Sequence, residues 1–168
     1  MNKIITLLFV FIFCFNTISQ TKDEALRDAK KTAKATLNSD FKTVVKHTFL
    51  PVIKIMGGKE KALEMISKSM ISMKNQGFEF KVADVISVSE IVNEQNQYRC
   101  FIKNNYVMNF NGEEITSVSY LLGIYNESKK YWTFIEAKQL ANPAMSQVLP
   151  NFKTKLIIPQ GTTSRKKL

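Results

Sequence analysis

The spacing of the apolar residues changes at Gly77 from that of a helix to that of a strand. From Lys59 to Gln76 the apolar residues recur every three or four positions, which predicts one amphipathic helix, and a glycine just after it is typical of a helix end. From Phe78 onward apolar and polar residues alternate, which predicts strands. We therefore predict an α+β fold, with N-terminal helices packed on a curved four-stranded antiparallel meander that closes over the helix at 59–76.

The segment before Lys59 predicts further helices. Thr21 and Glu24 have the spacing of a capping box, so a helix should begin there. Pro51 suits the first turn of another short helix, and the glycines at 57–58 should end it.

The hairpin at 111–112 decides which face of the sheet each later residue occupies. A strict two-residue turn would place Phe110 opposite Glu113. It would also direct Val118 and Leu122 away from the helices. We therefore predict a loop of odd length or a bulge at this hairpin, so that both apolar residues face the core.

With odd loops at the other hairpins as well, four polar side chains fall into one row across the strands. They are Asp84, Asn104, Tyr120 and Glu136. Polar groups on an otherwise apolar face can orient a ligand, so this row is the candidate binding site. The alternative is that the row lies beyond the helix and simply meets water.

Residues 1–19 have the features of a cleaved signal peptide. Lys3 precedes a largely apolar run of 12 residues from Ile4 to Phe15, and small side chains follow at 17–19. The run is shorter than the roughly 20 residues of a membrane-spanning helix, so we expect no transmembrane anchor in the mature chain. These features predict a periplasmic or secreted protein.

The rest of the chain has the length of one domain. We assign 20–139 to the α+β domain. Residues 140–159 are interrupted by prolines and should form a strap that packs on it. Residues 160–168 are basic and poor in apolar side chains, so we expect a flexible tail.

The charge and the cysteine and histidine content limit the kinds of partner and site to expect. The formal net charge of +10 is compatible with anionic partners, although lysines spread along helices are typical of solvated surfaces. An exported chain rarely meets nucleic acid, so we expect no nucleic-acid partner.

Cys100 lies on an apolar strand face, which predicts a buried, inert thiol. His47 near a helix end could be a base paired with a carboxylate, but a packed or solvent-facing role is the usual one. The sequence contains one histidine, no cysteine pair in the mature chain and no phosphate-binding loop, so we predict no metal site and no cofactor.

The order of helices before a long-stranded meander, with an aromatic last strand at 130–135, resembles the cystatin-like cone of the nuclear transport factor two-like superfamily. The resemblance covers roughly residues 21–136. It implies a curved sheet around the longest helix and an apolar pocket at the open end, which some members use for catalysis and others for ligands or dimerisation. No catalytic residue is carried over from it.

We therefore expect an exported, non-enzymatic domain that binds a small ligand or a protein partner in the cone mouth through the four polar residues. One alternative is an acid–base enzyme of the isomerase or dehydratase kind, with Asp84, Tyr120 and Glu136 as candidate groups. Another is an envelope-associated protein that works through its basic surface. Pairing of two copies through the sheet face also stays open.

Overall fold

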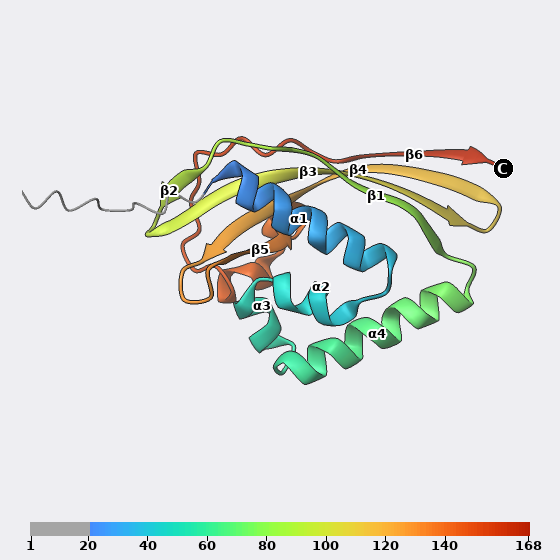
Figure 1. Cartoon of the computed structure of the whole chain (residues 1–168), viewed down its shortest axis with the longest axis horizontal. Helices are drawn as coiled ribbons and strands as arrows, with labels where there is room; N and C mark the ends of the chain where they lie inside the picture. Colours follow the sequence, from blue (N-terminus) through green and yellow to red (C-terminus); the bar gives the residue numbers. More distant parts are fainter. Residues whose placement is uncertain (1–20) are drawn as a thin grey trace, which may run out of the picture.

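The computed structural model describes residues 21–168, so the predicted signal peptide lies outside the described residues. Within them, four helices precede a six-stranded antiparallel sheet (Figure 1), which confirms the predicted α+β class. The helices are α1 (Lys22–Leu37), α2 (Phe41–His47), α3 (Leu50–Ile55) and α4 (Lys59–Asn75). The strands are β1 (Glu79–Val88), β2 (Val92–Glu94), β3 (Gln97–Phe110), β4 (Glu113–Asn126), β5 (Tyr131–Glu136) and β6 (Thr162–Lys167). Two 3-10 turns, η1 (Ala137–Ala141) and η2 (Pro143–Gln147), follow β5.

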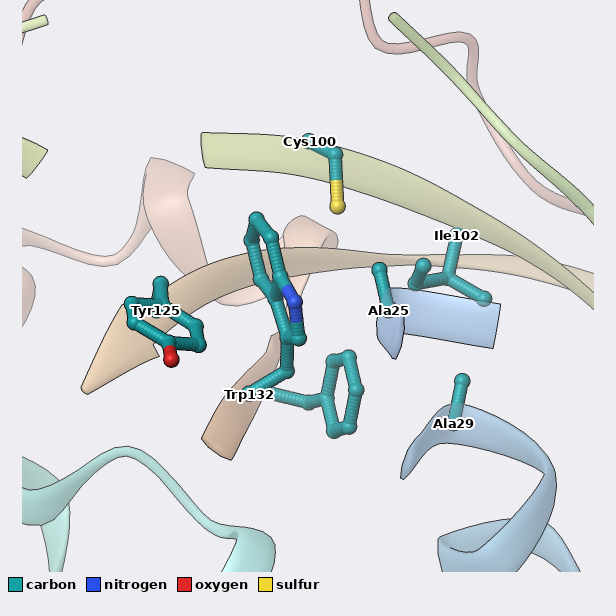
Figure 2. Packing of buried hydrophobic residues seen from close by; sticks show 7 residues of the cluster. Ala25, Ala29, Cys100, Ile102, Tyr125 and Trp132 are labelled. Atoms are coloured by element: carbon teal, nitrogen blue, oxygen red, sulfur yellow. The ribbon is translucent and has the colours of Figure 1, made fainter. Parts of the chain in front are cut away.

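Helix α1, and not α4, packs on the sheet. The capping box predicted at its start is present: the Thr21 hydroxyl accepts from the Glu24 N–H at 3.2 Å, and the Thr21 N–H donates back to the Glu24 carboxylate at 3.3 Å. Small alanine side chains on one face of α1 let the helix approach the sheet closely. Figure 2 shows two of them, Ala25 and Ala29, beside Cys100, Ile102 and Trp132.

Our expectation that the sheet closes over α4 is therefore wrong. Helix α4 packs against α2 and α3, lies farther from the sheet than α1 (Figure 1), and fully buries only Ala62. The physical reason why α1 and not α4 lies on the sheet is the size of the side chains on the two helices. The alanine stripe of α1 allows a close helix–sheet approach, whereas the long side chains of α4 keep it on the outer side of the helical layer.

The sheet has the order β1-β3-β4-β5, a meander in which all pairs are antiparallel. Strand β2 extends the β3 edge, and β6 pairs with the outer edge of β4. Two register shifts interrupt the pairing of β1 with β3, between Phe80 and Val82 and between Val85 and Ser87. Each shift changes which face the following residues of β1 occupy.

The hairpin between β3 and β4 is a strict two-residue turn, so the predicted odd loop is wrong. Phe110 pairs with Glu113, and Asn111 and Gly112 have φ of 50° and 76°. Both central residues with positive φ make the turn type that matches the twist of a hairpin. Leu122 consequently faces away from α1, as this turn requires.

The face turned away from α1 has its own apolar cover. Leu122, Ile124 and Ile135 pack there against the strap, residues 140–159, and against Phe49 and Val52 at the start of α3. The strap contributes Leu140, Met145, Val148, Leu149, Phe152, Leu156 and Ile158. Arg99, only 2 % exposed, fastens it by donating to the Lys153 carbonyl at 2.9 Å. The sheet is thus covered on both faces, which explains why the apolar residues of β4 need not point toward the helices.

The C-terminal segment forms β6, in contrast to the flexible tail that we expected. Its side chains are all exposed, so they contribute little burial. The pairing rests on backbone hydrogen bonds to the edge of β4 and on opposite charges, including Arg165 Nη1 to Glu113 Oε2 at 3.3 Å. Our expectation counted only the apolar surface of the tail and overlooked the free strand edge.

No helix within residues 21–168 is long and apolar enough to cross a membrane.

Candidate functional site

The register places two of the four predicted residues on each face of the sheet. Asn104 pairs with Ser119, and Glu136 pairs with Leu121. Because side chains alternate along a strand, both lie on the face that carries Ile102 and packs on α1.

Asp84 and Tyr120 lie on the opposite face. Asp84 pairs with Asn105, and Tyr120 pairs with Lys103. The single cross-strand row is therefore wrong. The error has two causes, the two-residue turn at 111–112 and the register shifts in β1. Both change whether the even-numbered or the odd-numbered residues of a strand lie on a given face of the sheet.

A cavity of about 750 Å³ opens where the outer edge of β4 has no strand partner. Strand β5 ends opposite Leu121, and β6 begins opposite Val118, so the edge is open at residues 119–120. The strap crosses this gap on its way to β6. The lining includes Ser117, Ser119, Tyr120, Glu136, Leu156 and Ile158.

The gap brings Glu136 and Tyr120 to one cavity from the two faces of the sheet. Asn104 lies one strand farther in, behind Ser119, and does not line the cavity itself. Asp84 is exposed on β1, two strands away from the gap, and takes no part in the site.

Burial governs the ionisation of the site. It raises the pKa of the half-buried Glu136 carboxyl, although the nearby Lys138 ammonium acts in the opposite direction. Burial also raises the pKa of Tyr106 to about 12, and the Glu136 carboxylate adds to that increase. The Tyr106 phenol therefore stays protonated at neutral pH, and Glu136 binds a proton more readily than an exposed glutamate does.

On the face of the sheet that carries Glu136, one cross-strand pair of polar side chains leaves two atoms without a hydrogen-bond partner among the described residues. They are Ser119 Oγ and Asn104 Oδ1. The Asn104 amide donates to the Tyr106 hydroxyl at 3.3 Å, but its carbonyl oxygen is buried in a residue that is 1 % exposed. A buried polar atom without a partner costs about 1–3 kcal/mol, so a ligand that supplies a donor to Ser119, the one of the two residues that lines the cavity, is favoured.

Sequence reasoning missed Tyr106 and Ser119. Ser119 was assigned to the wrong face, because we required the largest apolar residues of β4 to face the helices, whereas Tyr106 was assigned to the correct face of β3 but counted only as one of its apolar residues. The signal that could have found Ser119 is the Asn-Gly pair itself, since a two-residue turn makes the odd-numbered positions of β4 share a face with the even-numbered positions of β3.

His47 and Cys100 belong to the packed interior. His47 is 2 % exposed, and its Nδ1–H donates to the Trp132 carbonyl at 2.9 Å. The backbone N–H of Trp132 donates to Asp28 Oδ2 at 2.9 Å. Hydrogen bonds therefore connect both α1 and α2 to β5. Cys100 is fully buried as predicted, and burial raises the pKa of its thiol to about 12. These contacts assign both residues to packing.

Within the described part of the chain, no three His, Cys, Asp or Glu side chains come together as metal ligands would. Comparison of the chain with protein-family models, with curated proteins and with solved structures finds no match. What the site can do therefore follows from its own chemistry: a carboxyl with a raised pKa, a serine hydroxyl, a buried amide and an apolar wall.

Proposed function

We propose that the protein is a non-enzymatic binding domain that takes a small ligand at the open edge of β4. The observation that carries the proposal is the cavity of about 750 Å³ that Ser119, whose Oγ has no partner, and the half-buried Glu136 line together. Cavities of this size suit small molecules, and a few convergent polar groups on an apolar wall fix their orientation.

The polar atoms of the site indicate the kind of ligand. The ionised Glu136 carboxylate is an acceptor, and the Ser119 hydroxyl accepts or donates. Leu156 and Ile158 of the strap supply apolar contact. We infer a ligand with hydroxyl or amine donors at one end and an apolar body at the other.

The wider assignment is also part of the proposal. Helices packed on one face of a bowed antiparallel meander support membership of the cystatin-like cone superfamily. The signal-like sequence at 1–19 supports export to the periplasm or the medium.

Ligand-observed NMR with a set of small alcohols and amines tests the proposal. Ser119→Ala should weaken binding about fivefold or more, because it removes one hydrogen bond worth about 1 kcal/mol, and Glu136→Gln should do the same, because it replaces a charge-assisted hydrogen bond by a neutral one that is about half as strong. Asp84→Asn is the matched control, since Asp84 lies on the other face and is exposed. Equal affinity in all three variants would contradict the proposal.

An acid–base enzyme is the second candidate, favoured by one observation. Glu136 has a raised pKa and lies close enough to the neutral Tyr106 phenol to raise its pKa too, so one group could take a proton while the other stabilises a developing oxyanion. Turnover of a small carbonyl compound that is lost in both Glu136→Gln and Tyr106→Phe would support the enzyme over the binding domain.

A further inference from the structure

The second half of α4 carries an apolar face that the sheet leaves partly uncovered. Helix α4 contacts α2 and α3, and its first half packs there through Ala62, Leu63 and Ile66. Farther along, Met70 is half-buried and Ile71 is 56 % exposed. An exposed isoleucine beside other apolar side chains is unusual enough to indicate a binding surface.

This face forms one wall of a groove of about 470 Å³. The end of α1, the start of α2 and the start of β1 complete it. Six apolar side chains line the groove: Leu37, Phe41, Met70, Ile71, Phe78 and Phe80. The rings of Phe78 and Phe80 pack edge to face with centroids 5.0 Å apart, which gives the groove a firm floor opposite the flexible Met70.

The charges around the groove favour an anionic ligand. Lys74 lines it and forms no ion pair with any of residues 21–168. Among the described residues in the lining, Glu79 is the only carboxylate, and it is neutralised by Lys81 at 2.8 Å. Lys34 in the last turn of α1 adds positive charge to the same end of the helical layer.

We propose that this groove binds a long-chain fatty acid. The alkyl chain lies against the phenylalanine floor and the methionine and isoleucine wall, and the carboxylate pairs with Lys74. Burying an apolar chain supplies most of the affinity, because each methylene removed from water strengthens binding about fourfold, whereas a half-exposed ion pair contributes little. The groove shares no lining residue with the cavity at the β4 edge, so this proposal does not depend on the function proposed above.

Isothermal titration of the protein, expressed from its full coding sequence, with palmitate below its micelle concentration tests the proposal. Palmitate should bind at one site, and octanoate should bind at least about a hundredfold more weakly, because at about fourfold each the burial of only half of the eight lost methylenes already accounts for that factor. Ile71→Asn should weaken palmitate binding about fivefold to tenfold, and Lys74→Gln about threefold, with the latter effect shrinking at high salt.

Each variant has a matched control. Ile86→Asn replaces an isoleucine of equal exposure, 55 %, that lies on β1 outside the groove, and Lys153→Gln removes the same charge from the strap. Both controls should bind palmitate as the wild type does, as should Ser119→Ala. Because Ile71 is exposed, its replacement leaves folding intact, which circular dichroism checks.

Two results would overturn the proposal. One is palmitate binding that Ile71→Asn and Lys74→Gln leave unchanged. The other is no palmitate binding together with a concentration-dependent dimer that Ile71→Asn abolishes, which would identify the groove as an interface between two copies.

Discussion

A single methyl group added at Gly123 tests how tightly β4 packs beneath α1. Gly123 lies opposite Cys100 on β3 and Phe134 on β5. A Cβ at this position would stand 2.9 Å from the Cys100 Sγ and 3.4 Å from ring atoms of Phe134 and Trp132. The first distance is shorter than any ordinary contact, and the aromatic rings prevent the strand from moving the other way.

We expect Gly123→Ala to destabilise the protein by about 1–2 kcal/mol. Overpacking a filled core costs about 1–3 kcal/mol, and replacing glycine in a strand returns about 0.5–1 kcal/mol. For a domain of this size the midpoint of thermal unfolding should fall by about 3–8 °C. Urea unfolding followed by tryptophan fluorescence gives the free energy directly, because Trp132 is the only tryptophan and lies in this cluster.

A second substitution distinguishes this clash from a general effect of the mutation. Cys100→Ala removes the sulfur atom that the new methyl group would meet, so the double variant should be more stable than the sum of the two single effects predicts, by about 0.5–2 kcal/mol. If Gly123→Ala is as stable as the wild type, or if the two changes are additive, Gly123 does not face Cys100 and the register of β4 is wrong.

Two further predictions concern pH and the C-terminal strand. Burial lowers the pKa of His47 below its ordinary value of 6.5, so below that pH the unfolded chain binds more protons than the folded chain. The free energy of unfolding should therefore fall as the pH drops below 6.5. Urea unfolding measured across that range should show a smaller fall for His47→Gln. A pH dependence identical in wild type and variant would argue against a buried neutral histidine. A Cβ on Gly161 would lie 2.6 Å from the Val118 carbonyl oxygen, so Gly161→Ala should detach β6 from β4 and remove hydrogen-exchange protection at 162–167. Unchanged protection would show that the backbone just before β6 does not pass so close to β4.

Local sequence signals predicted the elements well. The capping box at Thr21 starts α1, the helical period at 59–76 becomes α4, and glycine at 77 precedes β1. The alternation after Phe78 predicted the four meander strands, and the aromatic last strand packs on α1 through Trp132. These signals act within a few residues of one another, so the sequence alone reveals them.

Long-range packing was predicted less well. We assumed that only one face of the sheet is covered, which led us to reject the two-residue turn at 111–112. The strap covers the second face with Val148 and Leu149. This contact joins residues that are far apart in the chain, so the local spacing of apolar residues does not predict it. The same assumption made α4 the central helix, although the alanines of α1 already indicated closer packing there.

The candidate site was predicted only in part, for the same reason. Glu136 and Asn104 lie on one face as expected, but Tyr120 reaches the cavity only because the sheet edge is open beside it, and Asp84 is on the far side. The gap between β5 and β6 depends on where the strap rejoins β4, a position that the polar sequence of the tail does not reveal.

Cross-strand backbone nuclear Overhauser effects around Asn104 test the central claim most directly. The proposed site requires Asn104 to lie opposite Ser119, because that pairing puts Ser119 on the helix-facing side with Glu136. We predict contacts between the backbone protons of Asn104 and Ser119. Contacts of Asn104 with Tyr120 instead would shift the register by one residue, turn Ser119 to the other face, and contradict both the site and the function proposed for it.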